Sequence, residues 1–226
     1  MMTEAALKGI RAVLYDFDGT LADSTELTML CYRHTMRTHL GEVLPDEEWL
    51  SGFGTTLEAQ MRRFARDPGE VEAMLDTYRE YQNSIHDGLV RPFPDAAETV
   101  AELERRGYGL AIVTSKRRRM AMRGMELCGL VRHFDVVVTP EDVTEAKPHP
   151  EPVLFALQKL GVAPHEALFV GDSPHDVAAG RAAGTRTAAA LWGPFPRQAL
   201  EEAGPDAFLH TQRDVLRLLN GHESGS

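Results

Sequence analysis

The sequence predicts an α/β fold, in which a Rossmann-like, doubly wound parallel sheet carries an inserted all-helical domain. Short, continuous apolar runs alternate with helical patterns through most of the chain, as expected of a parallel sheet covered by helices on both faces. By contrast, residues 22–91 show helical periodicity and no strand pattern. The segment RPFPDA, residues 91–96, then separates this stretch from the renewed alternation.

The helical stretch follows directly after the first strand, so the α/β core is predicted to be discontinuous. Residues 1–21 and 92–226 are expected to form the core, and residues 22–91 the insertion. A chain of 226 residues, of which 43% are hydrophobic, is long enough to bury a core of this kind.

The first strand is predicted over the apolar run RAVLYD, residues 11–16. Within the insertion, a helical pattern runs from residue 22 to residue 40, and Thr55 or Thr56 can cap a second helix over residues 57–65. A third helix is indicated by nearly ideal i, i+3, i+4, i+7 spacing. The positions in this pattern are Val71, Met74, Leu75, Tyr78, Gln82 and Ile85.

Beyond the two prolines, four more apolar runs predict the remaining strands. They are YGLAIVTS (108–115), FDVVVT (134–139), ALFVGD (167–172) and TRTAAAL (185–191). Helices are expected at 95–106, between the second and third strands, and at 150–160, 174–183 and about 212–219. Gly107, Gly161 and Gly184 follow three of these helices, as is typical of the left-handed residue that ends a helix.

Composition argues against several classes of protein. A net charge of −10 disfavours nucleic acid as a partner and is explained by solubility. No apolar stretch approaches the length of a membrane span, and the N-terminal residues MMTEAALKGIRA lack the apolar core of a signal peptide. Cys31 and Cys128 form neither a disulfide framework nor a metal-binding spacing. We therefore expect a cytoplasmic protein without a membrane or nucleic-acid partner, and the oligomeric state is not indicated.

Polar side chains gather where the predicted strands end. In an open parallel sheet, ligands bind beyond the carboxyl ends of the strands, so these residues are expected to share one site. Residues of this kind come from four loops: Asp16 and Asp18, Thr114 and Ser115, Lys147, and Asp172 with Asp176.

This combination of acids, hydroxyls and a lysine favours phosphoryl chemistry with a metal. Converging carboxylates repel one another unless a cation binds, and a small set of oxygen ligands suits Mg²⁺. Hydroxyls, N–H groups at a helix start and a lysine bind phosphate oxygens. One carboxylate can attack phosphorus, and a second can transfer protons. The expected partner is therefore a small anionic phosphorylated substrate.

The segments DFDGT, VTS, KP and GDSPHD, in this order, resemble the four motifs of the haloacid dehalogenase superfamily of phosphatases. The helical insertion resembles the small cap of that family. The resemblance implies that Asp16 is the nucleophile and Asp18 the general acid/base. The resemblance also implies that Mg²⁺ is held by Asp16, the Asp18 backbone carbonyl and Asp172. It implies that the phosphoryl group is held by Thr114, Ser115 and Lys147. Asp176 would support the metal through water or from behind its ligands.

Within the superfamily, KPHPEPVLFAL and GDSPHDVAAGRAAGTRT are most similar to phosphoglycolate phosphatases and the related pyrophosphatase group. The predicted function is Mg²⁺-dependent hydrolysis of a small phosphate monoester through an aspartyl-phosphate. Hydrolysis of inorganic pyrophosphate and a phosphosugar mutase reaction remain alternatives. A non-catalytic chain that binds a phosphorylated ligand is a further alternative, although every catalytic position is filled.

Two further segments have both a functional and a structural interpretation. The basic run Lys116 to Arg119 either faces the mouth of the site or forms a solvated surface. The segment SGFGTTL, residues 51–57, is either a loop that closes over substrate or a turn between helices. Asp142 is either a further acid near the metal or a surface residue. His149 and His175 are expected beside the site or exposed.

Overall fold

A six-stranded parallel sheet forms the core of the computed structural model, which describes residue 7 and residues 9–220. Its strand order is β5-β4-β1-β6-β7-β8. The strands are β1 (Ala12–Tyr15), β4 (Gly109–Val113), β5 (Val136–Val138), β6 (Ala167–Gly171), β7 (Arg186–Ala190) and β8 (Ala207–Leu209). The chain order reverses at β1, which pairs with β4 on one side and β6 on the other. Such a reversal is where open α/β sheets bind ligands.

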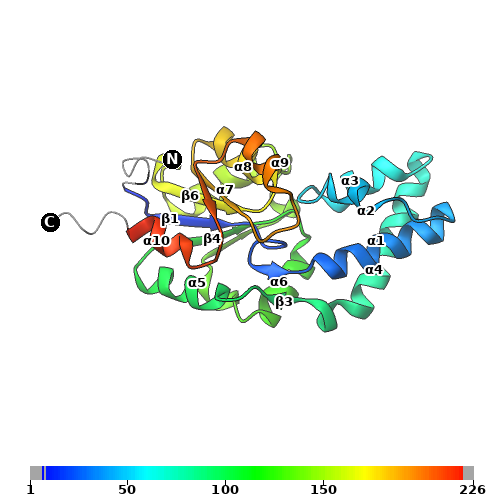
Figure 1. The fold of residues 1–226 in the computed structure, drawn as a ribbon, viewed down its shortest axis with the longest axis horizontal. Helices are drawn as coiled ribbons and strands as arrows, with labels where there is room; N and C mark the ends of the chain where they lie inside the picture. Colours follow the sequence, from blue (N-terminus) through cyan, green and yellow to red (C-terminus); the bar gives the residue numbers. More distant parts are fainter. Residues whose placement is uncertain (1–6, 8, 221–226) are drawn as a thin grey trace.

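Helices cover both faces of this sheet, as predicted (Figure 1). One face packs on α5 (Ala96–Arg105), α6 (Arg118–Leu127) and α10 (Asp214–Asn220), and the other on α7 (Glu151–Leu160), α8 (Pro174–Ala183) and α9 (Arg197–Ala203). Within β1, Val13 and Tyr15 belong to the first core, whereas Ala12 and Leu14 belong to the second. This alternation explains why the strand is apolar at every position.

Four helices beyond the edge of the sheet form a separate layer, called the cap below (Figure 1). They are α1 (Thr25–Leu40), α2 (Asp46–Leu50), α3 (Leu57–Phe64) and α4 (Pro68–Leu89). Thr56 caps α3, because its hydroxyl accepts a hydrogen bond from the Ala59 N–H at 3.3 Å. The cap core is aromatic: Trp49 stacks on Tyr32, with ring centroids 4.8 Å apart, and on Tyr78 at 5.9 Å.

The cap is joined to the sheet by two short strands, β2 (Ala22–Asp23) and β3 (Arg91–Pro92), which pair antiparallel. The expectation of a helical pattern from residue 22, with no strand, was therefore wrong at its start, and α1 begins at Thr25. A two-residue strand exists only through its pairing partner, so it leaves no periodicity in the sequence. The domain boundaries at residues 21/22 and 91/92 stay predictions.

Two elements near the C-terminus were not expected from the sequence, the three-residue strand β8 and the seven-residue helix α9. Each is shorter than the window in which periodicity can be read. The expected helix near 212–219 corresponds to α10. In the portion of the chain that the structure describes, no helix has both the length and the apolar character of a membrane span.

Candidate active site

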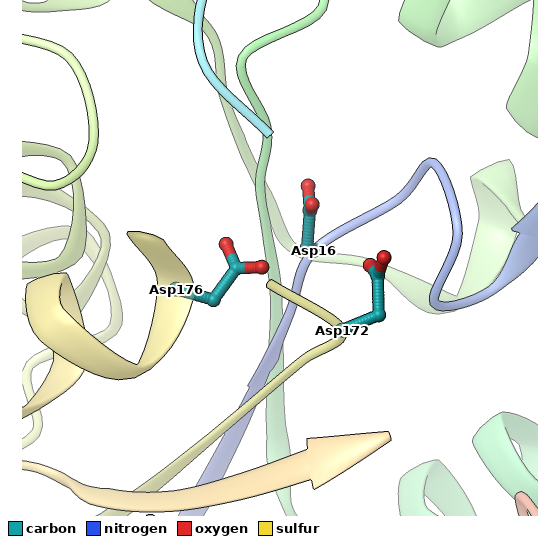
Figure 2. A group of neighbouring side chains, drawn as sticks. All are labelled: Asp16, Asp172 and Asp176. Carbon is teal, nitrogen blue, oxygen red and sulfur yellow. The ribbon is translucent and has the colours of Figure 1, made fainter. Parts of the chain in front are cut away.

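Three aspartates meet at the carboxyl edge of the sheet, beside β1 and β6 (Figure 2). Asp16 directly follows β1, and its N–H donates to the Val170 carbonyl at 2.9 Å, which extends the pairing with β6. Asp172 directly follows β6, and Asp176 lies in the first turn of α8. One carboxylate oxygen from each lies within 4.8 Å of the others, and all three side chains are buried. Parallel pairing in register therefore brings acids 156 residues apart in sequence to one point.

Lys147 is the cation of this cluster. Its Nζ lies 3.0 Å from Asp16 Oδ1 and 2.6 Å from Asp176 Oδ1, and it donates to the Val113 carbonyl at 3.0 Å. Burial by itself lowers the pKa of this ammonium group, but the charges of Asp16 and Asp176 outweigh burial and raise it above its usual range. Lys147 is therefore charged at neutral pH.

Asp172 keeps one carboxylate oxygen without a protein partner. Its Oδ1 accepts a hydrogen bond from the Thr20 hydroxyl at 2.6 Å, but its buried Oδ2 has no hydrogen-bond partner among the described residues. Burial, and then the charges of Asp176 and Asp16, raise the pKa of Asp172 well above its ordinary value. Burial likewise raises the pKa of Asp16 from 3.8 to about 7, although Lys147 opposes the shift.

The charges of this cluster fit a divalent cation. Three carboxylates face one ammonium group, so their full ionisation leaves a buried excess of negative charge. The unpartnered Asp172 oxygen and the wholly oxygen donor set are typical of a hard ion such as Mg²⁺. The residues present thus suit the metal that the sequence predicts.

Asp176 differs from Asp172, because both of its oxygens already have protein partners. Oδ1 contacts Lys147, and Oδ2 accepts from the Ser173 N–H at 3.1 Å and from the Ser173 hydroxyl at 2.6 Å. The Ser173 hydroxyl in turn accepts from the Asp176 N–H at 3.2 Å, which completes a capping box at the start of α8. Asp176 therefore fixes both the helix start and the lysine.

The loop after β1 lies tightly against Asp172. Gly19 has a φ of +79°, and a Cβ at this position would lie 2.4 Å from Asp172 Oδ2. The next carbonyl, of Thr20, accepts from Trp192 Nε1 at 2.9 Å and from Gln212 Nε2 at 2.6 Å. Only glycine lets the backbone come this close to Asp172 with a positive φ, so packing against this acid explains the glycine of DFDGT.

Asp18 lies outside the cluster of three acids and faces a cavity. Its Oδ1 accepts hydrogen bonds from the Ser24 hydroxyl at 2.6 Å and from Lys116 Nζ at 2.7 Å. The cavity, of about 360 Å³, lies between the sheet edge and the cap, and Asp16, Asp18 and Thr114 are in its wall. Thr114 Oγ1 accepts from the Lys116 N–H at 3.1 Å, which leaves its own proton free to donate.

The family model of the haloacid dehalogenase-like hydrolases matches residues 13–190, which include the four aspartates, Lys147 and Thr114. This chain belongs to the haloacid dehalogenase-like hydrolase family. It is therefore a phosphatase-type hydrolase, as the motifs indicated. The structure also shows the expected α/β fold, since similar solved structures of the family superpose over nearly the whole chain.

Relatives and solved structures extend the match beyond the motifs. Pyrophosphatase PpaX of Bacillus cereus (strain AH820) is 41% identical over 211 residues, which cover 93% of this chain and 97% of that protein. A haloacid dehalogenase-like family hydrolase from Streptococcus pneumoniae has a TM-score of 0.80 at 27% identity, covering 92% and 98% of the two chains. A predicted phosphoglycolate phosphatase from Haemophilus somnus has a TM-score of 0.84, covering 96% and 99%, and at 22% identity it supports the fold alone.

In this hydrolase, the segment SGFGTTL approaches the site from the cap. The Ser115 hydroxyl donates to the Gly54 carbonyl at 2.6 Å, and both residues line the cavity. Gly54 has a φ of +88°, and a Cβ there would lie 2.7 Å from Ser173 Oγ. The segment thus contacts two of the loops that follow core strands. The Ser115 hydroxyl donates its hydrogen bond to the cap in this structure, and its expected binding of the phosphoryl group stays a prediction.

The basic run of the hydrolase divides between two environments. Lys116 reaches Asp18, and Arg117 pairs with Glu141 at 3.2 Å beside the cavity. Arg118 instead pairs with Asp142, whose carboxylate also accepts from the Thr139 N–H and hydroxyl. Asp142 is therefore held by these structural contacts and is not part of the cluster of three acids. The side-chain contacts of the run were not readable from its sequence.

Several residues of the site were missed in the sequence. Thr20 and Ser24 bind two of the acids, and their only signal is a hydroxyl a few residues after DFDG. Ser173 sits inside GDSPHD, where the S-x-x-D spacing of a capping box was present.

His149, expected beside the site or exposed, is exposed, and its Nδ1 accepts from the Glu151 N–H. His175 is half-buried, and burial lowers its pKa.

Proposed function

We propose that this protein is a Mg²⁺-dependent phosphatase that transfers phosphate from a small anionic substrate to Asp16 and then to water. The observation that carries this proposal is the placement of Asp16. Its carboxylate is next to Lys147 and the carboxylate of Asp172, and it also lines the cavity with Asp18 and Thr114.

Asp16, the backbone carbonyl of Asp18 and Asp172 are the residues that would hold Mg²⁺, with Asp176 and Lys147 behind them. When bound, the ion offsets the negative charge of the phosphoryl oxygens and of the converging acids. Thr114 and Lys147 supply donors for the same oxygens. Ser115 is expected to contribute only when its bond to Gly54 is broken.

The first half of the reaction is attack of an Asp16 oxygen on phosphorus. A bond from that oxygen to phosphorus forms while the bond to the leaving oxygen breaks, and Asp18 delivers a proton to the leaving oxygen. In the second half, Asp18 takes a proton from water as the water oxygen attacks phosphorus. The Asp16–phosphorus bond then breaks, which releases inorganic phosphate and restores Asp16.

Two substrates are the first to test. The segments around Lys147 and Asp172 resemble both the phosphoglycolate phosphatases and the related pyrophosphatase group, and the B. cereus relative, which is 41% identical over nearly its full length, is named a pyrophosphatase. We therefore keep inorganic pyrophosphate as the second candidate. The acidic net charge of −10 supports the further expectation of no nucleic-acid partner.

The test is phosphate release with Mg²⁺ from 2-phosphoglycolate, pyrophosphate, phosphosugars and nucleoside monophosphates, with Asp16→Asn as the blank. We expect release from at least one substrate, loss of release with EDTA, and less than a few per cent of activity in Asp16→Asn at unchanged melting temperature. Substantial activity in that variant would reject Asp16 as nucleophile. Conversion of a phosphosugar without release of phosphate would identify a mutase, and no turnover of any kind would favour a binding protein.

A further inference from the structure

We propose that the leaving group of the substrate carries a negative charge of its own, which Arg79 of the cap and Arg119 of the core bind from the two walls of the cavity. This inference rests on the proposed phosphatase function and defines the class of its substrate. The class consists of small compounds with one phosphoryl group and a second anionic group, either a phosphate or a carboxylate.

Arg119 is the unpaired member of the basic run. It lies in the first turn of α6, is exposed and lines the cavity. Its three predecessors each contact an acid, Lys116 with Asp18, Arg117 with Glu141 and Arg118 with Asp142. Within residues 9–220, Arg119 has no hydrogen bond or ion pair, although it stands at a helix start where a cation is disfavoured by the dipole. A ligand anion would supply the missing partner.

The facing wall, on α4, carries two unsatisfied polar atoms. Arg79 Nε and Asn83 Oδ1 are buried and have no hydrogen-bond partner among the described residues, and both side chains line the cavity. They are four residues apart and therefore lie on the same face of α4. The guanidinium group of Arg79 has only long contacts, of 3.4 Å, to Glu72 and Asp76. Buried polar atoms of this kind are costly unless a ligand satisfies them.

Among the charged side chains that line the cavity, only these two arginines have no opposite charge within the site, since the long contacts of Arg79 are to Glu72 and Asp76, which lie outside the cavity wall. Asp18 offsets Lys116, Glu141 offsets Arg117, and Asp16 is offset by Lys147 behind it. Because the phosphoryl group must lie against Asp16, Arg79 and Arg119 are left for the part of the substrate that departs. An uncharged leaving group would desolvate these guanidinium groups without compensation, whereas a charged one would form charge-assisted hydrogen bonds with them.

The experiment compares kcat/KM for pyrophosphate and for 2-phosphoglycolate with kcat/KM for phenyl phosphate, whose leaving group has no anionic group besides the leaving oxygen. In Arg79→Gln and in Arg119→Gln, we expect kcat/KM for a doubly anionic substrate, divided by kcat/KM for phenyl phosphate, to fall about tenfold. The change should come mainly from KM, as for loss of one charged hydrogen bond. Arg119→Lys keeps the positive charge, so its ratio of kcat/KM values should lie between those of the parent enzyme and of Arg119→Gln. The substrate whose ratio falls more identifies the second anionic group as phosphate or carboxylate.

The matched control is Arg62→Gln, which removes an exposed cap arginine paired with Glu58 and outside the cavity wall. It should leave the ratio unchanged. Inhibition by methylenediphosphonate, a non-hydrolysable double anion, should weaken about tenfold in both test variants, which measures binding independently of turnover. If the two variants lowered kcat/KM equally for all substrates, or changed neither ratio, the inference would be overturned, but the proposed phosphatase function would not. Absence of turnover in the parent enzyme, relative to Asp16→Asn, would instead overturn the proposed function.

Discussion

The ammonium group of Lys147 lies 2.6 Å from the carboxylate of Asp176, and both groups are buried. The same nitrogen is 3.0 Å from Asp16, so a single cation separates two acids that would otherwise repel each other. Removal of this cation is therefore expected to affect stability as well as the proposed binding of phosphate.

Lys147→Met should destabilise the metal-free protein by about 3 kcal/mol at pH 7.5, because it leaves buried carboxylates without their counter-charge. The loss should shrink as the pH is lowered, since protonation of the acids removes the repulsion. Urea unfolding at pH 7.5 and 5.5 measures both effects. An equal loss at the two pH values would contradict the electrostatic explanation.

The raised pKa values of the acids predict how pH acts on the metal-free enzyme. The pKa of Asp16 is raised from 3.8 to about 7, and that of Asp172 is raised well above its ordinary value, so the folded state binds protons that the unfolded state releases. The stabilisation from these groups is complete below about pH 4 and is lost as the pH rises through 7.

Under the proposed function these acids bind Mg²⁺, and the ion would then compete with those protons, so the gain in melting temperature on adding Mg²⁺ should grow from pH 5.5 to pH 8. Differential scanning fluorimetry with and without the ion measures this gain. A gain that is larger at pH 5.5 than at pH 8 would show that the acids are not its ligands.

Thr20→Val should weaken Mg²⁺ binding about tenfold or more, because Asp172 loses the hydroxyl that orients its Oδ1. The substitution nearly preserves side-chain volume, so the fold should persist. Isothermal titration with Mg²⁺ gives the affinity. A matched control is Thr38→Val, which removes an exposed hydroxyl that donates only to the His34 carbonyl in the cap. An unchanged affinity in Thr20→Val would remove Thr20 from the metal site.

Gly54→Ala should lower kcat/KM at least tenfold, because the added methyl group would lie 2.7 Å from Ser173 Oγ and would push the cap loop away from the core. Gly41→Ala is the matched control. Gly41 also has a positive φ, of +76°, and also lies in the cap, but its Cβ would meet no atom within 4 Å. Both variants should lose about 1 kcal/mol of stability from backbone strain. If both lost activity equally, strain and not the contact with Ser173 would be responsible.

The sequence predicted the parts of the fold that depend on local pattern. Five of the six sheet strands were predicted, because each contains an apolar run that is visible in the sequence, such as AVLY and ALFVG. The acids were expected together because they end those strands. The parallel register of β1 and β6 is the physical cause of that meeting, and it follows from the fold class.

The parts that were not predicted depend on contacts between distant segments. The bond from Ser115 to Gly54 links residues 61 positions apart, and the pair of Lys116 with Asp18 spans 98 positions. Arg79 and Asn83 occupy polar positions of an ordinary amphipathic helix, so nothing in α4 alone marks them as facing a cavity. Side-chain partners of this kind are set by how the cap meets the sheet.

Asp18 stands four residues before Ala22, the first residue of β2, and a β-bridge joins these two residues. The Ser24 hydroxyl that holds the Asp18 carboxylate lies on the far side of β2, at the entrance to the cap. Asp18, the side chain proposed to transfer protons, is thus attached to the hinge segment about which the cap would rotate. Opening of the cap to admit water would therefore also reorient Asp18. The same movement that replaces the leaving group by water would then change Asp18 from a proton donor to a proton acceptor.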